Sequence, residues 1–291
     1  GRQILMGPQA QLLHGGTRLH LQHGPIDLII GADGDRPAAF AAAQARFATV
    51  LDELVQELPA LRQPLSTDTR APAGAIARKM QRAAHPYAAE GFVTPMAAVA
   101  GAVADTVLHA ICAATPLTRA YVNNGGDIAL HLTTGQHFTS AISGHNGADL
   151  GRIVIPHDSP VRGIATSGRH GRSLSLGIAD SVTVLARTAA EADVAATMIA
   201  NAVDLPGHPA ITRTPACSLD DNSDLGDMPV VTHCGTLPAT DRRLALEQGR
   251  KRADDLIQKG RILGAALFLQ GDNRNCGTPL ANLSIRTAEH A

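Results

Sequence analysis

Residues 121–130 read Tyr-Val-Asn-Asn-Gly-Gly-Asp-Ile-Ala-Leu and place two glycines and an aspartate in the middle of an apolar stretch. The apolar residues predict a buried strand, whereas glycine in a strand interior costs conformational entropy and contributes no side-chain packing. The interruption therefore indicates a β-bulge, with Asp127 bonded by neighbouring backbone N–H groups, or a position where a ligand approaches the backbone. These residues alone leave both interpretations open.

The chain around this stretch has the patterns of an α/β (α+β) fold, in which mixed antiparallel sheets pack with long Ala-rich helices. The helix expected over 95–115 begins after Thr94 with Pro95, and its small residues imply close packing against a flat surface. The other expected helices span 37–58, 189–203 and about 240–259. The expected strands comprise a hairpin at 17–30 turning at Gly24-Pro25 and segments near 137–143, 151–155, 181–187 and 229–233, whereas 59–74 is expected to be a surface loop.

Length and composition limit the class of protein. With 291 residues the chain can form one domain over 1–291, or two intimately joined sub-domains with a boundary near residue 206. A net charge of −1 without a cluster of Lys and Arg argues against nucleic acid as a partner. No segment approaches the roughly 20 apolar residues of a membrane span, so no membrane association is expected.

The cysteines and histidines carry little signal by themselves. Four widely spaced cysteines without a Cys-x-x-Cys pair favour reduced thiols and a cytoplasmic location. The sequence begins with Gly1 rather than Met, which leaves open a segment removed before it. Residues 220–227 are expected to be an acidic turn rather than a calcium loop, because Leu225 stands where that loop needs Gly. Histidines expected on the surface or in the core, for lack of metal-ligand spacing, are His20, His23, His131, His137, His145 and His233.

Two short segments have side chains suited to binding a phosphate or a cation. Asp193 and Thr197 lie four residues apart on an expected helix, so they share a face and could offer a carboxylate and a hydroxyl to one hard cation. The alternative is that Asp193 interacts with the helix dipole and Thr197 bonds its own backbone. Thr166-Ser167-Gly168 offers N–H groups and hydroxyls that suit a phosphate, although such a tripeptide alone more often forms a simple turn.

Taken in order, the polar segments resemble those of the ApbE-like superfamily, whose best-known members are flavin transferases that move FMN from FAD to a protein threonine using magnesium. That family has a helix with Lys-Gly-x-x-x-Asp, a strand with Gly-Gly-Asp or Gly-Gly-Asn, then Thr-Ser-Gly and Ala-Asp-x-x-x-Thr. The resemblance covers roughly residues 90–205. The matching residues here are Gly101 and Asp105, Gly125-Gly126-Asp127, Thr166-Ser167-Gly168, and Ala192-Asp193 with Thr197.

Nearly the whole chain is also similar to an uncharacterised ApbE-like family known only by a UPF label. This similarity includes Gly-Pro-Ile-Asp-Leu-Ile near the start and Pro-Met-Ala-Ala-Val-Ala-Gly-Ala-Val-Ala-Asp in the Ala-rich helix. It also includes Ser-Leu-Ser-Leu-Gly-Ile-Ala-Asp after Thr-Ser-Gly and Asp-Asn-Ser-Asp-Leu-Gly-Asp at 221–227. Members of this family are associated with one-carbon cofactor pathways, which implies a pterin-related substrate as an alternative to a flavin.

The resemblance implies a set of site residues. Magnesium ligands would be Asp193, Thr197 and a backbone carbonyl near Ala165. The candidates for proton transfer, chosen as titratable residues of this chain, are Asp127, Asp180 and His170. The implied cofactor-binding residues are Asp105, Asn124, Gly125, Gly126, Thr166, Ser167 and Gly168. Two departures put flavin transfer itself in question: Ala100 replaces the family's lysine, and the His-x-x-Asp-Pro-x-Thr-Gly segment is missing.

We therefore expect a magnesium-dependent, transferase-like enzyme that acts on a phosphate-bearing cofactor, either FAD or FMN or a pterin. Its cleft is expected between the Gly-Gly-Asp strand, the Thr-Ser-Gly turn and the helix over 189–203. Two alternatives remain open. One is a flavin- or nucleotide-binding protein without catalysis, and the other is a scaffold whose Ala-rich helix packs in a homodimer or larger homo-oligomer.

Overall fold

The computed structural model describes residues 6–147 and 149–277. Two compact units emerge from the contacts within the chain, and each unit is assembled from several segments. Of the described residues, unit 1 comprises 6–138, 156–164 and 188–191, and unit 2 comprises 139–147, 149–155, 165–187 and 192–277. The expectation of a single ApbE-like domain over 1–291 stays a prediction.

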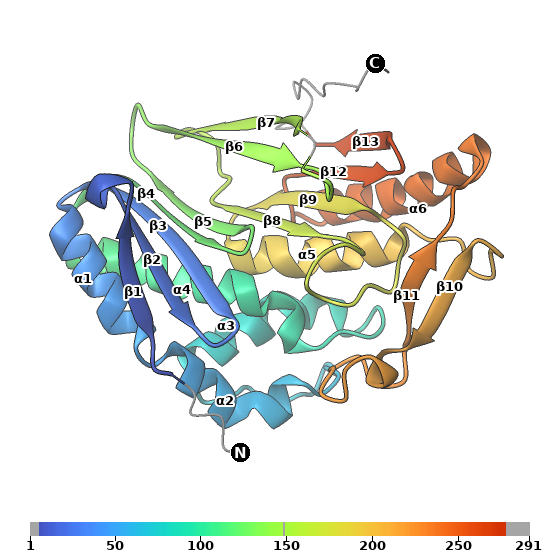
Figure 1. Cartoon of the computed structure of the whole chain (residues 1–291), viewed down its shortest axis with the longest axis horizontal. Coiled ribbons are helices and arrows are strands. Elements are labelled where there is room, and N and C mark those ends of the chain that lie inside the picture. Colours follow the sequence, from blue (N-terminus) through green and yellow to red (C-terminus); the bar gives the residue numbers. More distant parts are fainter. Residues whose placement is uncertain (1–5, 148, 278–291) are drawn as a thin grey trace. The chain divides into compact units, whose positions relative to one another are not determined.

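Unit 1 is built on an antiparallel sheet formed from both ends of its longest segment (Figure 1). The hairpin expected at 17–30 is confirmed, and it turns at Gly24, whose φ of 56° suits glycine. The 3-10 turn η1 (His14–Gly16) joins the first two strands. The strands lie in the order β1 (Gln9–Leu13), β2 (Arg18–His23), β3 (Ile26–Gly34), β4 (Leu117–Asn124) and β5 (Asp127–Leu132), and β5 also pairs with the first residues of β8 (Gly163–Ser167).

The stretch at 121–130 is a tight hairpin, so the interpretation of it as one interrupted strand is wrong. Strand β4 ends at Asn124, β5 begins at Asp127, and these two residues face each other across the turn. Gly125 and Gly126 have φ angles of 61° and 105°, which fits the two-residue turns that need positive φ at both positions. The Asn123 side chain accepts a hydrogen bond from Gly126 N at 2.8 Å. The glycines are therefore required by the turn, and both are exposed.

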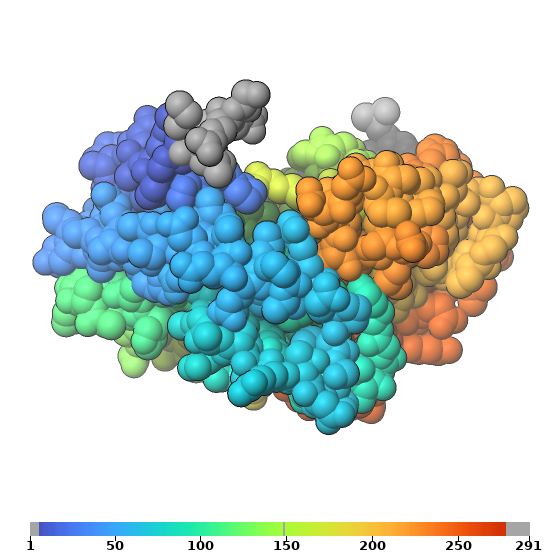
Figure 2. Space-filling view, turned by 90° about the horizontal axis from the view of Figure 1, so that it is seen from below, coloured from blue at the N-terminus to red at the C-terminus, as the bar shows by residue number. Residues whose placement is uncertain are grey.

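Helices α1 (Arg36–Phe47) and α2 (Val50–Leu61) replace the single helix expected over 37–58. The chain turns between them at Thr49, whose hydroxyl donates to Glu53 at 2.8 Å, while Arg46 donates to the same carboxylate at 2.6 Å. These polar contacts thus stabilise a bend between the two helices, where helical periodicity alone predicted one continuous helix. Because α2 reaches Leu61, the loop expected from residue 59 begins later. The amphipathic helix α3 (Ala75–Ala84), which follows that loop and was not predicted, buries Ile76 and Met80. Figure 2 shows α2 and α3, in blue to cyan, at the surface of unit 1.

The Ala-rich helix expected over 95–115 is confirmed as the 3-10 turn η3 (Pro95–Ala98) followed by α4 (Val99–Ala114). Thr94 caps its start by accepting a hydrogen bond from Met96 N at 3.2 Å. The prediction that no segment approaches a membrane span is wrong, because an 18-residue window of the helical segment Pro95–Ala114 has a mean hydropathy of 1.7. Half of the most apolar window of this segment is buried, and α4 packs on α1, β4 and β5, so it is a core helix of unit 1.

Gly101 on α4 is expected to be intolerant of any side chain. A Cβ at this position would lie 2.2 Å from the carbonyl oxygen of Ala189, which is backbone and cannot rotate away. Alanine gains about 1 kcal/mol over glycine in a helix, whereas overpacking a core costs roughly 1–3 kcal/mol. We expect Gly101→Ala to lower the free energy of unfolding by about 2 kcal/mol in urea denaturation. Gly7→Ala is the control, because no atom lies within 4 Å of its added Cβ; equal stability of both variants would contradict this packing.

Unit 2 holds a second set of strands with one long helix against it. Its strands follow the order β8, β9 (Ser181–Ala186), β12 (Gly264–Leu269) and β13 (Asp272–Cys276), and α6 (Ala239–Gln258) packs on β12 and β13. Two further pairs are β6 (His137–Ser143) with β7 (Asp149–Pro156) and β10 (Ile211–Pro215) with β11 (Pro229–Cys234). Most of α5 (Ala189–Ala202) also belongs to this unit. These elements confirm the strands and helices expected after residue 137.

Candidate functional site

The residues after β8 form a compact polar cluster in unit 2 around the carboxylate of Asp180. Strand β8 ends at Ser167, and Gly168 follows with a φ of 152°. A Cβ on Gly168 would lie 2.4 Å from Asp180 O, so only glycine lets the chain pass this close to Asp180. Arg169 N then donates to Ala179 O at 3.0 Å, which closes the loop between these two residues. The sequence Thr-Ser-Gly is thus the end of a strand, and its glycine positions the residues that follow.

Asp180 interacts with three groups from two segments of unit 2. One carboxylate oxygen lies 2.9 Å from Nε2 of His170 and 3.6 Å from Nε of Arg169. The other oxygen accepts a hydrogen bond from Gln270 N at 2.6 Å. Because the carboxylate can only accept, Nε2 of His170 carries the hydrogen and Nδ1 remains free to accept a proton. The pair therefore has the arrangement of a general base held in one tautomer by an aspartate.

The surroundings of His170 favour its neutral form. Burial lowers the pKa of the imidazole below 6.5, and the charges of Arg169 and His145 add to this effect, whereas the hydrogen bond to Asp180 opposes it. The side chain is 26% exposed, so it can still meet a substrate. At neutral pH it is consequently an unprotonated base.

His145 completes the cluster, although it was expected to be only a surface or core histidine without a role at the site. Its ring stacks on that of His170, with centroids 3.9 Å apart and an angle of 14° between the planes. One ligand atom from each of His145, His170 and Asp180 lies within 4.8 Å of the others, a donor set that could also hold a metal ion. The guanidinium of Arg169 competes for the same carboxylate. Sequence spacing could not have identified His145, because the fold of the connection between β6 and β7 is what brings it next to His170.

The residues expected to bind magnesium and the Thr-Ser-Gly segment also belong to unit 2. Asp193 and Thr197 are both half-buried on α5, one helical turn apart, and Ala165 is buried in β8. Thr166 Oγ1 lies 3.0 Å from the hydroxyl of Thr183 on the neighbouring strand β9. These positions leave the expected roles of the residues as predictions.

The remaining expected site residues belong to unit 1, so the cleft predicted between the segments stays a prediction. Asn124 donates to the carbonyl oxygen of Ala100 at 3.1 Å, and Asp127 is buried with 6% of its surface exposed. Asp105 accepts hydrogen bonds from Ala189 N at 3.0 Å and Ala190 N at 2.9 Å. Both oxygens of Asp105 are therefore bonded to the start of α5.

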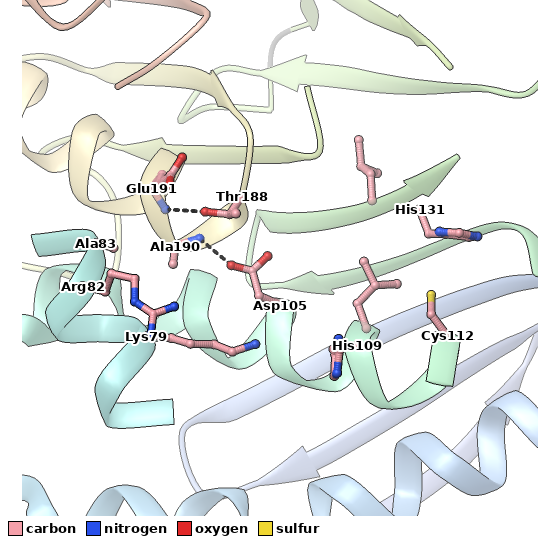
Figure 3. A pocket seen from close by; sticks show the side chains of 12 residues that line it. Lys79, Arg82, Ala83, Asp105, His109, Cys112, His131, Thr188, Ala190 and Glu191 are labelled. Atoms are coloured by element: carbon pink, nitrogen blue, oxygen red, sulfur yellow. Dashed lines mark hydrogen bonds between the residues drawn. The ribbon is translucent and has the colours of Figure 1, made fainter. Parts of the chain in front are cut away.

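A pocket of about 440 Å³ opens beside Asp105, and all of its lining residues belong to unit 1 (Figure 3). Helix α3 contributes Lys79 and Arg82, and α4 contributes His109 and Cys112. None of these residues was expected at a site, because α3 was not predicted and its two cations lie one turn apart without any motif around them. The other lining residues are Ala83, Asp105, Leu108, Leu130, His131, Thr188, Ala190 and Glu191.

Comparison with known proteins gives a family match over almost the whole chain. The family model described as AbpE bacteria matches residues 10–275. The chain is 35% identical over 179 residues to the UPF0280 protein of Methanopyrus kandleri, which covers 60% of this chain and 69% of that protein. It is 35% identical over 187 residues to the UPF0280 protein of Methanothermobacter thermautotrophicus, covering 59% and 68%. The match to the UPF0280 protein of Methanococcus vannielii, 42% identical, spans only 45% of that protein.

Solved structures show the same fold at low sequence identity. The flavin transferase ApbE from Vibrio cholerae superposes with a TM-score of 0.53 and 12% identity, covering 94% of this chain and all of that one. The apo flavinyl transferase ApbE from Pseudomonas stutzeri gives a TM-score of 0.50 and 11% identity, covering 96% and 98%. The expectation of an ApbE-like α/β fold with antiparallel sheets is thereby confirmed.

Proposed function

Because the chain belongs to the family described as AbpE bacteria, we propose that it is an ApbE-like enzyme that transfers part of a phosphate-bearing, flavin-type cofactor to a hydroxyl group. The fold shared with two flavin transferases supports this reaction class. The observation that carries the proposal is the pairing of His170 with Asp180, which supplies an oriented base directly after the Thr-Ser-Gly strand end.

In this proposal Nδ1 of His170 takes the proton of the acceptor hydroxyl as its oxygen attacks the phosphorus atom. The new oxygen–phosphorus bond replaces the bond to the second phosphate, and a nucleoside monophosphate leaves. Asp180 fixes the tautomer and stabilises the imidazolium that forms. The backbone N–H groups and hydroxyls of Thr166-Ser167-Gly168 would hold phosphate oxygens.

Asp193 and Thr197 have the donor chemistry for magnesium. A carboxylate and a hydroxyl one helical turn apart are hard oxygen ligands, and both side chains are half-buried rather than fully solvated. The carbonyl of Ala165 would be a third ligand. Magnesium bound there would neutralise phosphate charge and hold the leaving group.

One departure from the flavin transferases favours a second candidate function, cofactor binding without transfer. Ala100 stands at their lysine position, and the contact found there is its backbone carbonyl accepting from Asn124. A carbonyl cannot replace a cation beside phosphate. A reduced pterin bearing a phosphate is the alternative substrate for the same site.

A thermal-shift titration tests the proposal, because a ligand that binds only the native protein raises its melting temperature. FAD, FMN, ATP and a reduced pterin are each added with magnesium and with EDTA. We expect FAD to raise the melting temperature only with magnesium, and FAD turnover to release AMP. Binding of FAD without AMP release would support the non-catalytic alternative. No shift with any of the four compounds would contradict the proposal.

Asp193→Ala is expected to abolish the magnesium dependence of this shift, because the remaining hydroxyl and carbonyl ligands carry no charge. The affinity for FAD should then be the same in magnesium and in EDTA. Asp52→Ala is the control, since it removes a carboxylate from helix α2 of unit 1, whereas the proposed ligands belong to unit 2. If Asp193→Ala keeps the full magnesium effect, Asp193 serves the helix dipole rather than a cation.

A further inference from the structure

We propose that the pocket beside Asp105 is a second binding site, for a small phosphate monoester with a partly apolar body. None of the residues that carry the proposed reaction, His170, Asp180, Asp193 and Thr197, lines this pocket. Its volume of about 440 Å³ falls within the ~300–1,000 Å³ typical of small-molecule sites. The inference therefore goes beyond the proposed function.

Two cations on one wall of the pocket form no salt bridge with any residue that the structure describes. Lys79 and Arg82 are three residues apart on α3 and so project from the same face of the helix. Among the residues that the structure describes, neither takes part in a salt bridge or a side-chain hydrogen bond. Lys79 is half-buried, so its charge is partly removed from water without direct compensation. A multivalent anion that bridges both side chains would supply the missing negative charge.

The two carboxylates in the pocket do not neutralise these two cations by direct contact. Both oxygens of Asp105 already accept backbone N–H groups of α5, and Lys79 acts on Asp105 only through a longer-range attraction. The carboxylate of Glu191 points away from Lys79 and Arg82 (Figure 3). Glu191 N donates to the hydroxyl of Thr188 at 3.1 Å, so this N–H group of the helix start is also used. A bound anion would therefore meet the side chains of α3 rather than the helix terminus.

The rest of the lining suits the body of a phosphorylated molecule rather than a bare phosphate ion. Leu108, Leu130 and Ala83 provide apolar surface. His131 holds its Nε2 3.0 Å from the carbonyl oxygen of Leu117, which can only accept, so Nε2 donates and Nδ1 can accept a hydrogen bond from a ligand. A phosphate at the cations and a heterocycle or sugar over the apolar wall would use both parts of the pocket.

Cys112 provides a direct readout, because its thiol lines the pocket and is half-buried. The experiment follows the alkylation of Cys112 by mass spectrometry at mildly alkaline pH. Phosphate, AMP, glucose 6-phosphate or citrate is added in turn as the possible protecting ligand. AMP at about ten times its Kd should slow alkylation of Cys112 roughly tenfold. Cys217, which lies in unit 2 outside the pocket, is the internal control and should react at an unchanged rate. No protection by AMP or by glucose 6-phosphate at millimolar concentration overturns the proposal, and so does stronger protection by citrate.

Substitutions that remove a positive charge from α3 test whether the two cations are responsible for the protection of Cys112. Lys79→Gln and Arg82→Gln should each weaken AMP binding about tenfold, because each removes a charge-assisted hydrogen bond to phosphate. Arg78→Gln is the matched control, since Arg78 lies on the same helix but donates to Pro72 O outside the pocket. Unchanged protection in both Lys79→Gln and Arg82→Gln would overturn the proposal. Asp193→Ala should leave Cys112 protection unchanged, which separates failure of this site from failure of the proposed reaction.

Discussion

Replacement of His170 by alanine is expected to slow AMP release from FAD by about 10²–10⁴-fold, the usual contribution of a positioned general base. In the proposed reaction the imidazole would contact the acceptor hydroxyl rather than the cofactor, so the KM for FAD should change little. Asp180→Asn should cause a loss of similar size, since an amide cannot stabilise the imidazolium. His145→Ala is the control, because His145 stacks on the base without bonding Asp180. Undiminished turnover by His170→Ala would eliminate this residue as the base.

The pH dependence of turnover provides a second check on the same residue. His170 acts as a base only when it is neutral, and burial lowers its pKa from 6.5. Turnover should therefore persist as the pH falls past 6.5 and decline only below it. In Arg169→Gln the loss of the neighbouring cation should raise this pKa, so the decline should begin at higher pH. If the decline of turnover at low pH occurs at the same pH in Arg169→Gln, a group other than His170 causes it.

Asp105→Ala is expected to lower the free energy of unfolding by about 2–4 kcal/mol, because it leaves two buried backbone N–H groups without acceptors. Those groups belong to Ala189 and Ala190 at the start of α5. Asp35→Ala is the matched control at the start of α1, where one exposed carboxylate accepts from Ala38 N at 3.1 Å. An exposed cap of this kind contributes about 1 kcal/mol. Equal losses for both variants in urea denaturation would mean that water satisfies the α5 groups.

The stability difference caused by Asp105→Ala should also depend on pH. Burial raises the pKa of Asp105 above its ordinary value of 3.8, and the hydrogen bonds to Ala190 and Ala189 offset only part of that rise. A raised pKa means that the stabilising contribution is complete below 3.8 and is lost as the pH rises through the folded value. The wild type should therefore exceed the variant by more at about pH 4 than at about pH 7. The opposite trend would show that the ionised form is the better acceptor.

Periodicity predicted well those elements whose burial follows one regular pattern. The Ala-rich helix begins at Pro95 as expected, and the strand expected at 181–187 is β9, whose residues are all buried. The corner at Thr49 was missed because the apolar spacing continues through it while a polar cluster ends the helix. Gly125-Gly126 was misinterpreted for a related reason. Apolar residues on both sides resemble one strand, and only the pairing of Asn124 with Asp127 distinguishes a hairpin from a bulge.

The ApbE-like resemblance, most of the helices and strands, and the candidacy of His170 and Asp180 follow from the order of residues alone, because these depend on residue type and local spacing. The stacking of His145 on His170 and the pocket lined by Lys79, Arg82 and Asp105 become visible only in the folded chain. These contacts join residues far apart in the chain, and the pairing of strands and packing of helices that bring them together leave no periodic signal at the residues themselves. Local order along the chain is set by backbone and side-chain preferences, whereas a site is set by which elements bury their apolar faces against one another.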